Sequence, residues 1–169
     1  MVLGLLVPLA IVALSAIGCA EEASETSDAT WENFAVQPFS PHVEPGESHP
    51  PYNSRPATSG WHYGAVARWG VYEDVLIPEE VLVHNLEHGG IGIHFDCDEP
   101  CPELVEDLAE IAGRYDKVVM SPYPDMGSRI ALTAWTFLDA FDEFDDQRII
   151  AFIKAHISSP DAPEGSLPP

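Results

Sequence analysis

The hydrophobic period changes several times between residues 79 and 157, and this limits the chain to folds that mix helices with strands. Residues 102–115 carry apolar side chains at helical spacing behind Pro102, which suits a helix start. Residues 90–97 alternate instead, with Ile91, Ile93 and Phe95 on one face and His94 on the other. We predict helices over 79–88, 102–115 and 145–157, and strands over 90–97, 117–123 and 129–137. This order predicts a compact single α+β domain with a mainly antiparallel sheet and two or three packed helices.

The amino-terminal residues 2–18 carry no charge and are followed by Cys19, which is typical of an export signal. Because "AIGC" resembles a bacterial lipobox, lipid modification of Cys19 is the first expectation. An uncleaved membrane anchor and a buried helix are the alternatives. Either of the first two places the protein outside the cytoplasm, at the membrane. We expect a signal or anchor over 1–18, a flexible tether over 19–38, a globular domain over 39–157 and a Pro-rich tail over 158–169.

The net charge of −21, from 28 acidic and 7 basic residues, excludes a nucleic-acid-binding role and adhesion to anionic lipid headgroups. Both of those partners require basic patches. Much of the acid lies in "DCDEPCPELVEDLAE" and "DAFDEFDDQ", which we interpret as solvated helix starts and faces. The charge therefore favours cations over anions as ligands.

Two cysteines, Cys97 and Cys101, remain beside Cys19. Their short, Pro-containing spacing favours a local disulfide over a metal-binding pair, since thiols are oxidised outside the cytoplasm.

The segment "HNLEHGG" places His84, Glu87 and His88 three and four positions apart, so a helix directs all three side chains into one small volume. That arrangement suits a metal ion. Capping of the helix end by the histidines is a simpler alternative. The same letters also satisfy H-x-x-E-H, the inverted zincin pattern, in which Glu87 would activate water on zinc. Gly89 and Gly90 break the helix at once, and a small domain has little room for a peptide cleft, so we favour metal binding over hydrolysis.

Further ligands are available in irregular parts of the chain. The segment 41–65 is too rich in Pro, Gly and Ser for regular structure, yet it carries His42 and His62. Met126 lies in the polar turn "PYPDMGS", where a thioether ligand would explain it. Imidazole and thioether donors favour copper, especially Cu(I), with zinc as the alternative ion.

Five stretches in this order resemble the bacterial family catalogued as domain of unknown function 3105: "HVEPGE", "YNSRPATSGWHY", "WGVYEDVLIPEEVLVHNLEHGGIGIHFD", "PYPDMGSRIALTAW" and "FDEFDDQRIIAFIKAH". The resemblance covers about residues 40–156. It implies export or membrane anchoring behind an apolar amino-terminal segment, and it implies no activity. Trp61 stands where proline is frequent in the family.

Three functions from different classes remain open. The first, which we favour, is copper binding or transfer without catalysis. We expect the imidazoles of His62, His84 and His88 to converge with Met126 as the nearest further donor, and Glu87, His94 and His42 to act as supporting or alternate ligands. The second is a zinc hydrolase. The third is an interaction domain in which the histidines are structural and a protein partner, which the sequence does not identify, binds exposed aromatic residues, namely Trp61, Tyr63, Trp69 and Tyr72.

Overall fold

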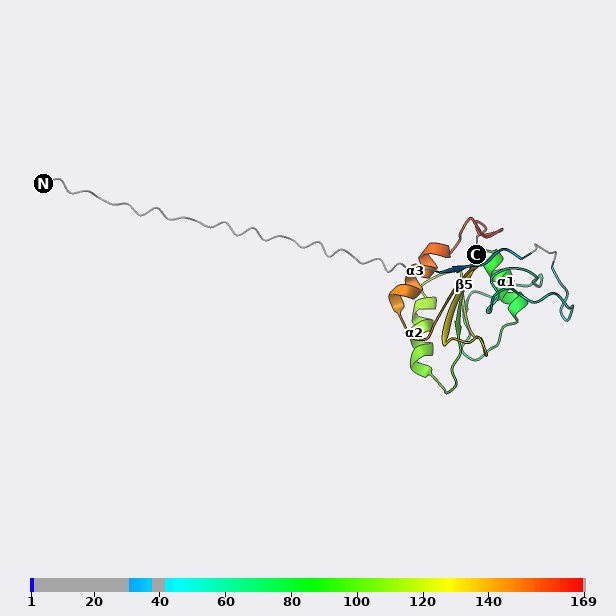
Figure 1. The fold of residues 1–169 in the computed structure, drawn as a ribbon, viewed down its shortest axis with the longest axis horizontal. Coiled ribbons are helices and arrows are strands. Elements are labelled where there is room, and N and C mark those ends of the chain that lie inside the picture. The colour runs from blue at the N-terminus through cyan, green and yellow to red at the C-terminus, as the bar shows by residue number, and fades with distance from the viewer. Residues whose placement is uncertain (2–30, 38–41, 169) are drawn as a thin grey trace.

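The computed structural model describes residue 1, residues 31–37 and residues 42–168. Cys19 and the apolar segment 2–18 lie outside the described residues, as does most of the expected tether. In the described part of the chain, three helices and six strands form one domain (Figure 1). The elements are β1 (Glu32–Asn33), β2 (Gly70–Val71), α1 (Glu79–Glu87), β3 (Ile91–Phe95), α2 (Pro102–Ala112), β4 (Val118–Pro122), β5 (Ile130–Ala134), β6 (Phe137–Phe141) and α3 (Asp146–His156).

The six strands form one mixed sheet in the order β1-β6-β5-β3-β4-β2. The pairs β1–β6, β6–β5 and β5–β3 are antiparallel, whereas β3–β4 and β4–β2 are parallel. The predicted α+β class with a mainly antiparallel sheet is therefore confirmed for the described residues. The two strands predicted at 117–123 and 129–137 are not neighbours, because β3 lies between them.

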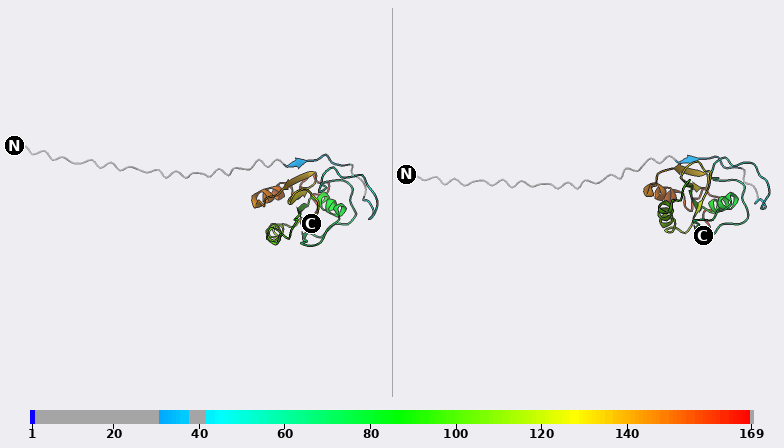
Figure 2. Two further views of the ribbon diagram at one scale, coloured as in Figure 1. Left: turned by 60° about the horizontal axis from the view of Figure 1, so that its bottom comes forward. Right: turned by 90° about the horizontal axis from the view of Figure 1, so that it is seen from below.

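Helices cover both faces of the sheet (Figures 1 and 2). On one face, α2 and α3 pack over Ile91, Ile93 and Phe95, the residues that alternation predicted to share a side of β3. On the other face, α1 contributes Leu82 to a second hydrophobic cluster that also contains Val119 from β4. The three predicted helices are all present, each shorter than predicted at one or both ends by one to three residues.

The short strands and β6 were missed. Residues 32–33, expected within the tether, pair with β6, and neighbouring Trp31 packs edge-on against Phe152 of α3. The acidic stretch after residue 138 begins as strand β6 rather than as a helix face. Its Asp139 is buried because Arg148 of α3 pairs with it at 2.5 Å.

The Pro-rich segment 158–168, expected as a tail beyond the domain, packs against the end of α1. The amide of Ser158 donates to the carbonyl of Gly89 at 2.8 Å, and the amide of Glu164 donates to that of Glu87 at 2.9 Å. Ala162 is buried. These backbone hydrogen bonds hold the segment although it has no regular structure. None of the helices among the described residues has the length and apolar character needed to span a bilayer.

Candidate metal centre

Helix α1 carries two of the site residues on one face. It starts after Pro78 with Glu79 and Glu80 in its first turn. Their carboxylates stabilise the helix because they lie at the positive end of its dipole. His84 and Glu87, one turn apart near its other end, are 7% and 3% exposed. Two polar side chains buried at a helix end need hydrogen-bonding or charged partners, and these partners come from elsewhere in the chain.

The two glycines after the helix allow other segments to approach it closely. Gly89 has a φ of +72°, and a Cβ at this position would lie 2.8 Å from the Cα of Gly165 in the carboxy-terminal segment. A Cβ on Gly90 would lie 2.5 Å from the ring of Trp69. The glycine pair thus ends the helix and also makes room for Trp69 and the carboxy-terminal segment.

His62 reaches α1 from the irregular segment, as the sequence predicted. The amide of the next residue, Tyr63, donates to the carbonyl of Glu80 in the first turn of α1 at 3.2 Å. The carbonyl of His62 accepts from the amide of Val43 at 2.9 Å, which brings the neighbouring His42 to the same place. His62 is 2% exposed, whereas His42 is exposed.

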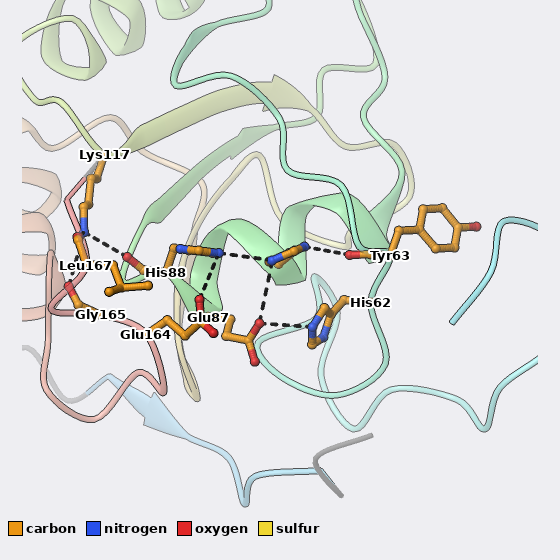
Figure 3. A network of polar contacts seen from close by, with 9 residues as sticks. His62, Tyr63, Glu87, His88, Lys117, Glu164, Gly165 and Leu167 are labelled. Carbon is orange, nitrogen blue, oxygen red and sulfur yellow. Dashed lines mark hydrogen bonds and ion pairs between the residues drawn. The ribbon is translucent and has the colours of Figure 1, made fainter. Parts of the chain in front are cut away.

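Four side chains converge at this point: His42, His62, His84 and Glu87. One ligand atom from each lies within 4.8 Å of those from the other three. Each pair among the three imidazoles has a ring-centroid distance of 5.0 Å. The Oε2 atom of Glu87 lies 3.1 Å from Nε2 of His62 and 3.8 Å from Nε2 of His84 (Figure 3).

Backbone carbonyls fix the orientation of the two buried imidazoles. Nδ1 of His62 donates to the carbonyl of Gly60 at 2.8 Å, and Nδ1 of His84 donates to the carbonyl of Tyr63 at 2.7 Å. Because a carbonyl only accepts, the proton must be on Nδ1 in each ring. The Nε2 atoms are then the ones that face the cluster, which is the arrangement that metal-binding histidines commonly show.

Burial, hydrogen bonds and nearby charges shift the pKa values of His62, Glu87 and His84. Burial lowers the pKa of His62, but the hydrogen bonds to Glu87 and Gly60 and the charge of Glu87 outweigh it, so this pKa is raised. Burial raises the pKa of Glu87, and its contacts with His62 and the charges of the other histidines outweigh that effect, so this pKa is lowered. Burial lowers the pKa of His84, and the charges of His62 and His88 lower it further. These shifts favour the imidazolium form of His62 and the carboxylate form of Glu87, because each charge stabilises the other.

The donor set fits a transition-metal ion. Around a tetrahedral ion with ligand bonds of 2.0–2.1 Å, ligand atoms lie about 3.3 Å apart. The distances of 3.1 and 3.8 Å from Glu87 to the two imidazoles are close to this value. Imidazole nitrogen suits zinc and copper, while magnesium and calcium require mainly oxygen ligands. The described residues therefore contain a His/Glu cluster that could hold a metal ion.

Two residues predicted for the site lie apart from this cluster. Met126 is buried in the hydrophobic cluster with Leu82 and Tyr123, so core packing accounts for it. His94 is buried in the sheet, where its Nε2 lies 3.0 Å from the hydroxyl of Thr133. His42, expected only as a supporting or alternate ligand, is a member of the four-residue group.

His88, expected as one of three converging imidazoles, is not a member of the four-residue group and lies next to it, after the last residue of α1. Its Nε2 is 3.1 Å from Nε2 of His84 and 3.4 Å from Oε2 of Glu164. Glu164 was missed because it belongs to the segment that we expected to be a tail. No periodicity or spacing in that segment relates it to α1, so the sequence contained no signal for it.

Other predicted features lie away from the histidines. A disulfide joins Cys97 to Cys101 in the connection between β3 and α2. A cavity of about 770 Å³ beside this disulfide shares no lining residue with the cluster. The four aromatic residues considered as a partner-binding face are all half-buried: Trp61, Tyr63, Trp69 and Tyr72. Trp69 and Tyr72 pack against the second hydrophobic cluster, and Trp61 stacks on His49, so packing accounts for these three.

A family model described as "Protein of unknown function (DUF3105)" matches residues 42–168. The match includes every residue of the cluster and the carboxy-terminal segment. No curated protein and no solved structure matches the chain significantly.

Proposed function

The chain belongs to the DUF3105 family, and because that description assigns no activity, we propose from its own residues that it is an exported, membrane-tethered copper-binding protein. The proposed ligands are His42, His62, His84 and Glu87. The observation that carries this proposal is the convergence of three imidazoles and a carboxylate, three of them buried, from two separate segments of the chain.

The donor set supports divalent copper rather than the Cu(I) that a thioether would favour. Three nitrogen ligands and one carboxylate oxygen are borderline donors, and for such a site affinity rises along the first-row divalent ions to a maximum at copper. The carbonyls of Gly60 and Tyr63 hold the two buried rings with Nε2 directed at the cluster, so little reorientation of the rings opposes binding. Zinc, which follows copper in this order, is the competing ion.

The location is part of the proposal and is supported by sequence. The uncharged run at 2–18 ends before Cys19, which would carry the lipid, and the chain contains a disulfide that suits an oxidising compartment. At the membrane surface, such a protein would hold copper or pass it on. The net charge of −21 favours the approach of cations.

Copper titration of the full chain tests this proposal. We expect one Cu(II) per chain in the wild type. In His62→Ala or His84→Ala, the affinity should fall by more than the roughly 10–100-fold that loss of a ligand's hydrogen-bonding partner costs. His49→Ala is the matched control, because His49 also faces a carboxylate, that of Glu80 at 3.5 Å, but lies outside the cluster. Equal affinities in all four proteins would refute the site.

A zinc hydrolase is the second candidate, because buried Glu87 belongs to an H-x-x-E-H segment and lies beside the imidazoles of His62 and His84. In that mechanism Glu87 would accept a proton from a zinc-bound water rather than bind the ion. The variant Glu87→Gln discriminates between the two. Retained zinc with lost hydrolysis of peptide, ester or amide substrates would favour the hydrolase, whereas weaker copper binding favours the proposal above.

A further inference from the structure

A second group of donor atoms lies on the opposite side of His84 from His62. It consists of His88 and Glu164, whose side chains contact each other at 3.4 Å. Nε2 of His84 lies 3.1 Å from Nε2 of His88 and 3.8 Å from Oε2 of Glu87, so it stands between the two groups. These contacts form a continuous series from Glu164 through His88 and His84 to Glu87 and His62. Figure 3 draws them as dashed lines and labels Glu164, His88, Glu87 and His62.

Exposure falls along this series. The side chain of Glu164 is 46% exposed and that of His88 is 24% exposed, whereas those of His84, Glu87 and His62 are 9%, 4% and 2% exposed. An ion that binds the first two residues can therefore come directly from solvent and meets two donors there. His42 is the exposed member of the inner group and offers an approaching ion a single donor. Each step between neighbouring donors is short enough for one ion to contact both at once.

Backbone contacts hold Glu164 in this position. Its amide donates to the carbonyl of Glu87 at 2.9 Å. The buried ammonium group of Lys117 donates to the carbonyls of His88 at 3.1 Å and Gly165 at 3.2 Å, which ties the helix end to the carboxy-terminal segment. A half-exposed His–Glu pair contributes little to stability by itself, so the fixed placement of Glu164 beside His88 points to another role.

We propose that His88 and Glu164 form an outer site that accepts Cu(II) from solvent and hands it to the inner site through His84, which binds the ion in both positions. This rests on the proposed function and names its loading route. In the outer position, the ion is bound by Glu164, His88 and His84. On hand-over, the bonds to Glu164 and His88 break as bonds to Glu87, His62 and His42 form. Copper remains divalent, and each imidazole nitrogen that was protonated releases its proton to solvent on binding the ion.

Stopped-flow mixing of the full chain with Cu(II), followed by tryptophan fluorescence, tests the route. Trp61 is adjacent to His62, so loading of the inner site should quench its emission. In His88→Gln and in Glu164→Gln, we expect loading to slow by about tenfold, equivalent to about 1.4 kcal/mol on the barrier, while the equilibrium affinity stays as in the wild type. His49→Gln, which disrupts a His–Glu pair outside the route, should load at the wild-type rate.

The remaining outcomes separate this inference from the proposed function. Wild-type loading rates in both variants would overturn the route and leave the copper site intact. A loss of equilibrium affinity in His88→Gln as large as that in His84→Ala would also overturn it, because His88 would then be a resident ligand. Failure of the wild type to bind copper at equilibrium would overturn both. Because Glu164 is half-exposed, Glu164→Gln tests the route in a protein whose core is unchanged.

Discussion

His94 is a buried histidine whose chemistry differs from that of the cluster. It lies in β3, where Nε2 contacts the hydroxyl of Thr133 and Nδ1 has no hydrogen-bond partner among the described residues. Burial without a compensating charge lowers its pKa from 6.5 to about 3. Near pH 6.5, where His94 of the unfolded chain begins to bind a proton, His94 of the folded protein therefore stays neutral.

This difference predicts an acid sensitivity. Above about pH 6.5 both states are neutral at His94, and its contribution to stability is fully present. As pH falls from 6.5 towards 3, only the unfolded chain binds the proton, so the free energy of unfolding falls by up to about 1.4 kcal/mol per pH unit. Urea unfolding of the metal-free protein between pH 7 and 4 measures this slope. His94→Gln should flatten it and His49→Gln should not; identical slopes in all three proteins would contradict the account.

At the residue scale, helical spacing predicted part of the site. His84 and Glu87 share a face of α1 because they are three positions apart, and that follows from sequence alone. Which loop histidines join them depends on the path of residues 42–63, which no local pattern determines. That is why the sequence did not predict that both His42 and His62 belong to the four-residue group. Met126 was expected as the nearest further donor, but core packing separates it from the cluster.

At the element scale, the carboxy-terminal segment completes the fold around α1. Lys117, immediately before β4, is buried and donates to the carbonyls of His88, Gly165 and Leu167, the last at 2.5 Å. A buried ammonium group with three backbone acceptors satisfies all its donors. The segment thus depends on one side chain for much of its attachment.

Replacing Lys117 by methionine should therefore release this segment. The three carbonyls lose a charged donor, so we expect the free energy of unfolding to fall by about 1–3 kcal/mol and residues 158–168 to become sensitive to protease. Limited proteolysis with mass spectrometry checks the cleavage site. Lys154→Met, at an exposed position of α3, is the control. Cleavage at the same rate in both variants would show that Lys117 does not secure the segment.

The elements with a strong hydrophobic period were predicted, whereas β1, β2 and β6 were not. Helices α2 and α3 and strand β3 each bury a regular set of apolar residues, so their periods are visible in the sequence. Strands β1 and β2 have two residues each, too few for any period. In β6, Asp139 concealed the strand, because its burial depends on a partner, Arg148, that only the fold brings near.

At the scale of the whole molecule, the disulfide and the His/Glu cluster lie at opposite ends of β3. The cluster lies by the end of α1 that precedes β3, whereas Cys97 and Cys101 follow the other end of β3. We expect the double variant Cys97→Ser/Cys101→Ser to lose about 2 kcal/mol of stability, the value for closing so short a loop. Its copper affinity should equal that of the wild type. Urea unfolding and copper titration measure the two quantities, and a parallel loss of affinity would contradict this separation.

The central claim is that two distant segments of this acidic domain form one copper site. A crystal structure of the copper-loaded protein, with anomalous data collected at the copper absorption edge, tests it most directly. The account predicts one strong peak at about 2.0–2.2 Å from Nε2 of His62, Nε2 of His84 and a carboxylate oxygen of Glu87, with His42 as the fourth ligand. A peak at the sulfur of Met126, or no peak at the cluster in a protein that has bound copper, would contradict it.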